Sequence, residues 1–392
     1  MSSAPLYMDL RGEVEDSDWP TGAAGWPNVL AVPDLESLRP RAYESGTAEV
    51  MADLYNAQGE LLAEAPRTVL RRVLELARQR GIEFNVGIEL EFFLFAKDDT
   101  AVLPPGQQAL RAQLGKQEAT LLRRLWECLE SMGLPPETAC VETGPAQLEV
   151  NLAGGPPLAA CDQATSFKRT VKQMADEAGI VATFMAKPLA DASGNGLHLH
   201  QTATRVEGES PLWLREGKAL AKTCQEFVAG QLAYAPELAA IYLPTVNSYK
   251  RTKLRGPAPL QLCWGWDNRS AAIRLLEAQD GGARVENRIG GGDANPYLLV
   301  AAALATGMEG ILGGLALEEP VVGNAYLDGA PRPHALPSDL VHALTALAQS
   351  DLAHSWFGTS FVDAFVRLKN REVDRFTSAV TDWEREEYLA FL

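Results

Sequence analysis

The stretch that most constrains the fold of this chain is residues 87–95, which read GIELEFFLF. Successive side chains of a β-strand point to opposite faces, so Glu89 and Glu91 share one face while Ile88 and Leu90 share the other. Burying an ionised carboxylate costs free energy unless it is paired or binds a cation. A half-exposed strand with a solvated acidic face would explain this stretch if it stood alone.

The same pattern of polar residues on one strand face recurs in three later stretches. These are QLEVNL at 147–152, GLHLHQT at 196–202 and RVENRI at 284–289. Their polar faces carry Gln147, Glu149 and Asn151, then His198, His200 and Thr202, then Arg284, Glu286 and Arg288. Four polar-faced strands predict an α+β fold, in which a curved sheet or open barrel holds a site on its concave face and helices pack behind it.

The chemistry of these faces indicates divalent metal ions beside an anion. The candidate metal ligands are Glu89, Glu91, Glu142, Glu149, Glu286 and His198, a set without cysteine that suits Mg²⁺ or Mn²⁺ better than a structural zinc site. The candidate anion ligands are Arg251, Arg269, Arg274, Arg284 and Arg288. Surface ion pairs would explain some of these arginines individually. Metals flanked by arginines favour phosphoryl transfer, and the absence of a GxxxxGK[ST] motif predicts an ATP site of a non-Walker type.

Composition excludes several classes of partner. The formal net charge is -16 and no cluster of Lys and Arg stands out, which argues against nucleic acid or an anionic membrane as a partner. The five cysteines include no CxxC pair and are expected to be free thiols in a reducing cytoplasm. We see no signal peptide and expect no apolar run of about 18 residues that spans a membrane.

Periodicity and turn residues divide the chain into a small first part and a large second part. Residues 1–65 are expected to form a small β-rich domain, with strands at 30–32 and 48–55, and residues 66–392 the main domain. Helices are predicted at 66–80, 116–132, 159–178, 295–312, 339–350 and 359–391. Further strands are predicted at 180–185, 261–266 and 271–276.

Eight ordered motifs resemble those of the glutamine synthetase family over roughly residues 27–392. They are GIELEFFLF, ETGPAQLE, FMAKP, GLHLH, NSYKR, DNRSAAIR, RVENRI and DANPYL. The resemblance implies a catalytic domain built on a curved antiparallel sheet around a bifunnel-shaped site, with a small β-grasp-like domain before it. It also implies ring-shaped homo-oligomers, commonly two stacked hexamers, whose sites are shared between neighbouring subunits.

The resemblance also implies a role for each candidate residue. One metal ion is held by Glu91, Glu142 and Glu149, and a second by Glu89, His198 and Glu286, with two or three ions in each site. Arg251, Arg288 and the backbone at Gly194 bind the amino acid, and His200, Thr202, Arg274 and Arg284 bind ATP, the co-substrate. Arg269 steadies the transferred phosphoryl group and counts as catalytic together with Glu89 and Glu286. The implied reaction makes an acyl phosphate from glutamate, which an amine then captures.

Three departures from the family pattern point to a changed amine. The flap glutamate that takes a proton from bound ammonium is replaced by Pro257. The family's Asn-Gly-Ser-Gly is here Ser-Gly-Asn-Gly at 193–196, and the first domain looks shortened, without the aspartate that would serve a neighbour's ammonium site. The chain resembles most the branch that makes γ-glutamyl amides of polyamines, ethanolamine or other primary amines, and its ending, VTDWEREEYLAFL, is similar to theirs. Two alternatives stay open: glutamine synthesis with ammonia and another base, or a non-catalytic paralogue that keeps the ring-forming fold.

Overall fold

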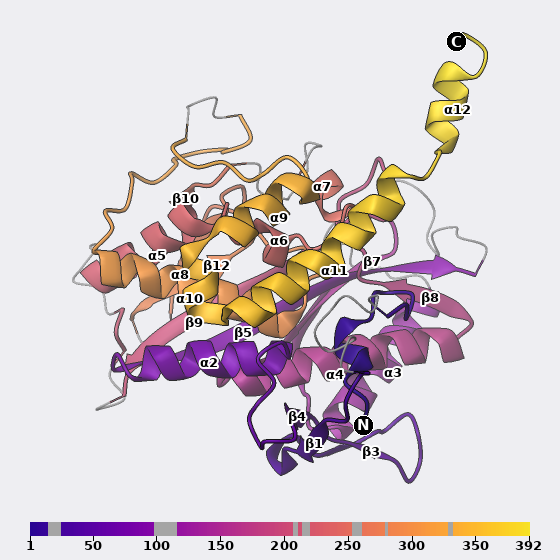
Figure 1. The fold of residues 1–392 in the computed structure, drawn as a ribbon, viewed down its shortest axis with the longest axis horizontal. Helices are drawn as coiled ribbons and strands as arrows, with labels where there is room; N and C mark the ends of the chain where they lie inside the picture. The colour runs from indigo at the N-terminus through magenta and orange to yellow at the C-terminus, as the bar shows by residue number, and fades with distance from the viewer. Residues whose placement is uncertain are drawn as a thin grey trace.

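An eight-stranded sheet lies at the centre of the molecule. The computed structural model describes residues 1–14, 25–97, 116–206, 211–213, 220–252, 261–278, 281–327 and 332–392. The main path of the sheet runs β10-β11-β12-β9-β5-β7-β6, and β8 pairs with the end of β5 (Figure 1). The strands are β5 (Ile82–Ala96), β6 (Pro136–Val141), β7 (Gln147–Leu152), β8 (Ile180–Thr183), β9 (Leu197–Arg205), β10 (Trp264–Trp266), β11 (Ile273–Glu277) and β12 (Ala283–Asn287).

Strand β5 pairs with three other strands of this sheet. It pairs antiparallel with β9 along residues 82–90, with β7 along 89–93 and with β8 along 93–96. The strand begins at Ile82, earlier than expected, because the residues before Gly87 also alternate and bury Ile82, Phe84 and Val86. The predicted antiparallel sheet is confirmed except for one pair, since β10 runs parallel to β11 and makes the sheet mixed.

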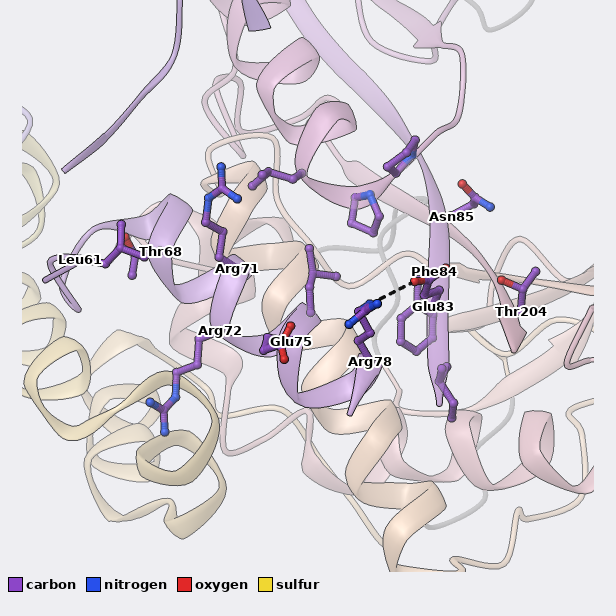
Figure 2. A pocket seen from close by; sticks show the side chains of 15 residues that line it. Leu61, Thr68, Arg71, Arg72, Glu75, Arg78, Glu83, Phe84, Asn85 and Thr204 are labelled. Atoms are coloured by element: carbon purple, nitrogen blue, oxygen red, sulfur yellow. Dashed lines mark ion pairs between the residues drawn. The ribbon is translucent and has the colours of Figure 1, made fainter. Parts of the chain in front are cut away.

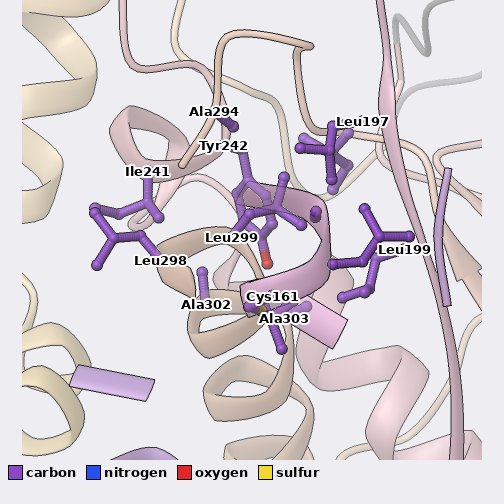
Figure 3. Packing of buried hydrophobic residues seen from close by; sticks show 14 of the residues in the cluster. Cys161, Leu197, Leu199, Ile241, Tyr242, Ala294, Leu298, Leu299, Ala302 and Ala303 are labelled. Atoms are coloured by element: carbon purple, nitrogen blue, oxygen red, sulfur yellow. The ribbon is translucent and has the colours of Figure 1, made fainter. Parts of the chain in front are cut away.

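Five helices form the hydrophobic core on the apolar side of the sheet. They are α2 (Pro66–Arg78), α3 (Lys116–Ser131), α4 (Pro157–Glu177), α5 (Lys222–Tyr234) and α8 (Pro296–Gly313). Among them, α2 and α4 contact β5 directly. Phe92 is fully buried and meets Phe167 of α4 with ring centroids 6.2 Å apart. Figure 3 shows side chains of α8 among those of β9, including Leu197 and Leu199. The helices cover this face of β5. A functional site can therefore form only on the opposite face, which carries Glu89 and Glu91.

Helix α8 is long and apolar enough to cross a membrane by length and composition alone. Its mean hydropathy is 1.4 over 18 residues, but 78% of that window is buried inside the protein. A buried core helix passes this test as well, so Pro296–Gly313 does not overturn the expectation that no apolar run spans a membrane. The helix is the centre of the hydrophobic core, where an apolar surface on all sides is required.

The remaining helices cover one side of the molecule and lead to its C-terminus. They are α6 (Ala239–Tyr242), α7 (Ser248–Arg251), α9 (Leu340–Gln349), α10 (Asp351–Phe357), α11 (Thr359–Thr377) and α12 (Asp382–Tyr388). The single helix predicted for 359–391 is wrong, because Thr381 and Glu384 form a capping box that starts a new helix. In Figure 1, α12 projects away from the body of the protein.

The described residues before α2, 1–14 and 25–65, form short strands and turns. Strand β1 (Leu30–Pro33) pairs with β4 (Ala52–Tyr55), and β2 (Arg39–Pro40) pairs with β3 (Ala48–Glu49). Two short 3₁₀ helices, η1 (Ala4–Tyr7) and η2 (Leu35–Ser37), complete this part. The division into domains at 1–65 and 66–392 stays a prediction.

Candidate active site

A row of acidic side chains crosses the sheet from β6 to β9. In the register of the strands, Cys140 on β6 lies opposite Glu149 on β7, and Glu149 lies opposite Glu91 on β5. Two residues along β5, Glu89 lies opposite His198 on β9. The register therefore brings together residues that lie up to 109 positions apart in the sequence.

His198 is held by one carboxylate and faces another. Its Nδ1 lies 2.6 Å from Oε1 of Glu89, and its Nε2 lies 3.8 Å from Oε1 of Glu91. The residue is only 3% exposed, and Nε2 has no hydrogen-bond partner among the described residues. A histidine that donates Nδ1–H to a carboxylate keeps a lone pair on Nε2, which is how metal-binding histidines are oriented. The unpaired buried nitrogen fits a cation between His198 and Glu91.

The carboxylates differ in how their charges are balanced. Although burial opposes its ionisation, contacts with His198 and His200 hold the pKa of Glu89 well below its usual value. Burial raises the pKa of Glu149 to about 9, and the charges of Glu89 and Glu91 push it in the same direction. Burial and the neighbouring Glu91 also raise the pKa of Glu142. Carboxylates that repel each other in a buried place favour binding of a divalent cation.

Glu286 is fully buried between arginines. It is 0% exposed, accepts a short hydrogen bond from Nη1 of Arg288 and another of 2.9 Å from Nη1 of Arg274. Burial opposes its ionisation, but the charge of Arg288 and those of the two histidines lower the pKa of the Glu286 carboxyl. Glu286 therefore joins the carboxylates of β5 to the arginines of β11 and β12.

Three groups of side chains lie close enough to share a metal ion. The groups are Glu89 with Glu91 and His198, Glu89 with His200 and Glu286, and Cys140 with Glu142 and Glu149. They contain all six predicted metal ligands, but they divide them differently from the two predicted sets. His200 lies 3.2 Å from Oε2 of Glu89, so it contacts the metal candidates as well as the predicted nucleotide pocket. The assignment of ligands to individual ions stays a prediction.

An open cavity of about 840 Å³ borders the carboxylates at one end of β5. Among its lining residues are the predicted nucleotide-binding and phosphoryl-binding residues His200, Thr202, Arg269, Arg274 and Arg284, beside Glu89 and Glu149. Arg269 and Arg284 are exposed and make no ion pair with any other described residue. Uncompensated arginines on a cavity wall favour an anionic ligand such as a polyphosphate.

The two arginines predicted to hold the amino acid are buried on the other side of the row. Arg251 and Arg288 are each 4% exposed, and Nε of each lacks a hydrogen-bond partner among the described residues. Burial lowers the pKa of Arg251, which donates from Nη1 to the carbonyl of Ile289 at 3.1 Å. A side chain at Gly194 would approach Cγ of Arg251 to 2.9 Å, so the glycine leaves room for this arginine.

Three residues that shape the site were not among the predicted site residues, although the sequence pattern places Gln147 on the polar face of its strand. Gln147 donates from Nε2 to Glu91 at 3.2 Å and to Oδ1 of Asn195 at 3.1 Å. Asn195 is fully buried and donates to the carbonyls of Thr183 and Met185, so it fixes the loop instead of lining the site. Cys140 was missed because strand β6 was not predicted, although its position two residues before Glu142 offered a signal.

A second cavity, of about 700 Å³, lies between α2 and the start of β5 (Figure 2). Its wall contains Arg71, Arg72 and Arg78 of α2, none of which was a candidate site residue. Arg78 pairs with Glu83 at 3.6 Å, and Arg72 donates to the carbonyl of Trp356 at 3.1 Å. Arg71 also pairs with Asp34 and Asp53, so two of the three arginines are balanced by carboxylates, and the cavity offers less free charge to an anion than the first one does.

The flap position lies outside the described residues. Pro257 falls in 253–260, so the structure gives no position for the residue on which the choice of amine was argued. The other predicted site residues lie along the row of carboxylates, in the first cavity or at the buried arginines.

Comparison with known proteins identifies the family. The sequence profile described as glutamine synthetase, catalytic domain, matches residues 63–388. The chain belongs to the glutamine synthetase family. It is thus an enzyme of the family's class, an ATP-dependent carbon–nitrogen ligase, and the non-catalytic alternative is set aside.

Relatives within the family include ligases for organic amines. A glutamate–isopropylamine ligase from a Pseudomonas species is 33% identical over 379 residues, which cover 93% of this chain and 82% of that protein. A gamma-glutamylethanolamide synthetase from Streptomyces coelicolor is 36% identical over 373 residues, which cover 92% and 79%. The solved structure of GmaS without ligand matches with a TM-score of 0.84 at 30% identity, covering 93% of this chain and 85% of that one. Proteins named glutamine synthetase are also among the relatives.

Proposed function

We propose that this chain joins the γ-carboxylate of glutamate to an organic primary amine, at the expense of ATP. The observation that carries the proposal is Pro257, which stands where the family's ammonium-deprotonating glutamate is expected. An organic amine is also protonated at neutral pH, so we propose that a carboxylate of the site other than the missing flap glutamate accepts its proton before the nitrogen attacks. Relatives named for isopropylamine and ethanolamide support an organic amine without identifying which one.

The proposed reaction has two steps. In the first, a γ-carboxylate oxygen of glutamate attacks the terminal phosphorus of ATP, the bond to the bridging oxygen breaks, and ADP leaves. In the second, the amine nitrogen attacks the acyl carbon, phosphate leaves, and the nitrogen loses a proton. The first step needs charge neutralisation around the transferred group, and Arg269, Arg274 and Arg284 line the cavity where ATP would lie.

The buried arginines suit the amino acid. Arg251 and Arg288 have unpaired Nε atoms beside the carboxylate row, and a substrate carboxylate would satisfy both. Gly194, whose carbonyl accepts from Gln147, would present its backbone to the same substrate. Mg²⁺ or Mn²⁺, when bound by the six ligands named above, would neutralise phosphate oxygens and orient the two reactants.

Further expectations belong to this proposal. We propose two or three divalent ions in each site, a cytoplasmic enzyme and a ring-shaped homo-oligomer of two hexamers. We also propose that residues 1–65 are a shortened β-grasp-like domain, and residues 66–392 the catalytic domain.

The proposal is tested by phosphate release from ATP with glutamate, Mg²⁺ or Mn²⁺, and a panel of amines. The panel contains ammonia, methylamine, ethanolamine, isopropylamine, putrescine and spermidine, and mass spectrometry identifies each amide. We expect one organic amine to exceed ammonia at least tenfold in kcat/KM. Ammonia as the best substrate, with glutamine as the product, would establish the second candidate function, glutamine synthesis.

The flap gives the first mutational prediction. Pro257→Glu restores the residue that the family pattern has at this position, so we expect the ratio of kcat/KM for ammonia to that for the organic amine to rise at least about tenfold. Pro257→Gln is the matched control, because it changes the backbone in the same way without adding a base. If this ratio rises equally in both variants, the effect comes from the loss of proline. If it rises in neither, position 257 does not determine the choice of amine.

A further inference from the structure

Arg269 lies on a tight turn, residues 267–270, that follows β10 and leads toward β11, the strand parallel to it. Arg269 is exposed and borders two cavities, the one of about 840 Å³ described above and a smaller one of about 560 Å³ that residues 320–323 also line. Its side chain has no ion-pair partner among the described residues. A long side chain without a partner has many rotamers, so its position depends on how firmly its backbone is held.

The backbone of the turn is strained at its first residue. Asp267 has a φ of 44°, in the left-handed region that residues with a side chain rarely occupy. Its amide donates to the carbonyl of Leu275 at 2.9 Å, and its carboxylate accepts from Nε of Arg274 at 3.0 Å. A strained residue persists where the surrounding contacts fix it, and such residues gather at functional sites. The turn is therefore held to β11 on one side.

On its other side the turn is bound to a separate segment, residues 321–325. Asn268, the residue before Arg269, donates from Nδ2 to the carbonyl of Val321 at 3.3 Å and to that of Gly323 at 2.8 Å. One amide group thus satisfies two backbone carbonyls of a segment that lies more than 50 positions later in the sequence.

Ser270, the residue after Arg269, completes the same network. Its hydroxyl donates to Oδ1 of Asn268 at 2.6 Å and accepts from the amide of Ala325 at 2.8 Å. Ala325 belongs to a small buried apolar cluster, whose other members are Cys263, Ala271 and Val321. The segment is thus anchored by apolar burial at both of its ends, and it is bonded to the turn on both sides of Arg269.

We propose that the 321–325 segment positions Arg269 for phosphoryl transfer, acting through Asn268 and Ser270. The inference rests on the proposed function, in which Arg269 steadies the transferred group. A charged group stabilises a transition state best when it is already in place, because no reorganisation is then needed during the reaction. Asn268 and Ser270 act through Arg269 and are therefore positioning residues. Their loss should lower kcat while KM for ATP and for glutamate stays nearly constant.

The test is a double-mutant cycle on kcat with saturating ATP, glutamate and Mn²⁺ and the best amine of the panel, ammonia included. We expect Asn268→Ala to lower kcat at least about tenfold and to change either KM less than about threefold. In the Arg269→Ala background the same substitution should lower kcat less than about twofold, because the side chain that it positions is gone. An equal loss of kcat in both backgrounds, or an effect on KM alone, would overturn the proposal.

Variants of Ser270 test the second link of the network. Ser270→Ala removes the hydroxyl that joins Asn268 to Ala325, whereas Ser270→Thr keeps a hydroxyl, so we expect kcat to fall in the first and to be retained in the second. Asn324→Ala is the matched control in the same segment, because Asn324 is exposed and its side chain accepts from the amide of Tyr326. An unchanged kcat in Ser270→Ala, or an equal fall in Asn324→Ala, contradicts the inference.

Hydrogen exchange, measured by mass spectrometry of peptides, tests the network without turnover. Asn268→Ala and Ser270→Ala should each raise exchange in residues 321–325 at least about tenfold, while exchange in β5 stays as in the wild type. Unchanged exchange in 321–325 refutes the positioning role of the segment, even in a working ligase. A wild type that turns over no amine, with the expected rise in exchange, refutes the proposed function alone.

Discussion

Single residues at the metal centre differ in what balances their charge. Glu286 faces Arg274 and Arg288, and Glu89 faces two histidines. Glu142 and Glu149 have a thiol and other carboxylates as neighbours, and the pKa of each is raised. Removal of a carboxylate should therefore have different effects at different positions, although all of them are candidate ligands.

Replacement of Glu286 tests the prediction that this residue, on the polar face of its strand, binds a metal ion. Glu286→Gln keeps the volume and removes the charge, so we expect at least about tenfold weaker Mn²⁺ binding by calorimetry and loss of ATP-dependent turnover. The matched control is Glu83→Gln, because Glu83 is exposed and its surface pair with Arg78 at 3.6 Å contributes little. Normal Mn²⁺ affinity in Glu286→Gln would show that Glu286 is not a ligand.

At the scale of helices, α5 and α8 cross at a pair of glycines. A side chain on Gly310 would collide with the carbonyl of Glu226 and approach Cα of Gly230 to 2.6 Å. The obstacles are backbone atoms, which cannot rotate away. The crossing therefore depends on both glycines, and α8 is the helix on which the core is built.

Gly310→Ala should separate these helices. We expect a loss of about 1–3 kcal/mol in the free energy of unfolding, measured by urea denaturation, as in other overpacked cores. Gly313→Ala is the control on the same helix, because its Cβ would meet only the Leu315 side chain at 3.6 Å. That variant should be neutral or stabilised by up to about 1 kcal/mol, since alanine favours helix. Equal effects of the two substitutions would contradict the close crossing.

Helix α9 carries a prediction about pH. Asp339 caps the helix by accepting from the amide of His342 at 3.0 Å, and this bond, with the His342 side chain, lowers the pKa of Asp339 to about 2. A carboxyl whose pKa falls on folding stabilises the protein above its ordinary pKa of 3.8, and this contribution is lost as the pH falls toward 2.

The measurement is the difference in urea midpoint between the wild type and Asp339→Ala. At pH 6 the cap should contribute about 1 kcal/mol, and the difference should shrink between pH 4 and the lowest pH at which the protein stays folded. Asp339→Asn keeps the hydrogen-bond acceptor without the titrating group. The difference in urea midpoint between Asp339→Asn and Asp339→Ala should therefore not change over this pH range. A constant difference between the wild type and Asp339→Ala would show that the charge has no role.

The elements that the sequence predicted are those with a strong period or a local stop signal. Strand β7 matches its predicted bounds, and α2 ends close to Gly81 as expected. Strand β6 was missed because PETACV shows no alternation of polar and apolar residues, and α5 because KTCQEFVAGQLAY does not gather its apolar residues on one helical face. The grouping of Cys140 with Glu149 depends on a pairing between strands, which no single strand encodes.

At the scale of the whole molecule, one arginine joins the first strands to two helices of the core. Arg67 of α2 makes two bonds to Asp162 of α4, at 3.0 and 2.9 Å, and one each to Asp34 and Asp53, at 2.6 and 2.5 Å. Asp162 also accepts from the hydroxyl of Tyr297 on α8 at 2.6 Å. The network connects residues 30–55 with two core helices.

Arg67→Met should loosen this connection. It leaves Asp162, 3% exposed, without its charged partner, and we expect a loss of about 3–5 kcal/mol in the free energy of unfolding. Hydrogen exchange should rise first in β1 and β4. The matched control, Arg71→Met, removes a cation that pairs with the same Asp34 and Asp53 but is 36% exposed, and should cost at most about 1 kcal/mol. A similar loss of free energy of unfolding in both variants would show that the buried ion pairs of Arg67 contribute no more than the exposed ones of Arg71.

The length of β5 restricts how this enzyme can change during evolution. Its alternate residues serve the core and the carboxylate row, so adding or deleting one residue between Ile82 and Phe95 would turn Glu89 and Glu91 into the core and bring apolar side chains into the site. Loops between strands can change length without this exchange of faces. New amine specificities in such a chain should therefore arise by insertions and deletions in its loops and by substitutions along β5, while the number of residues in β5 stays fixed.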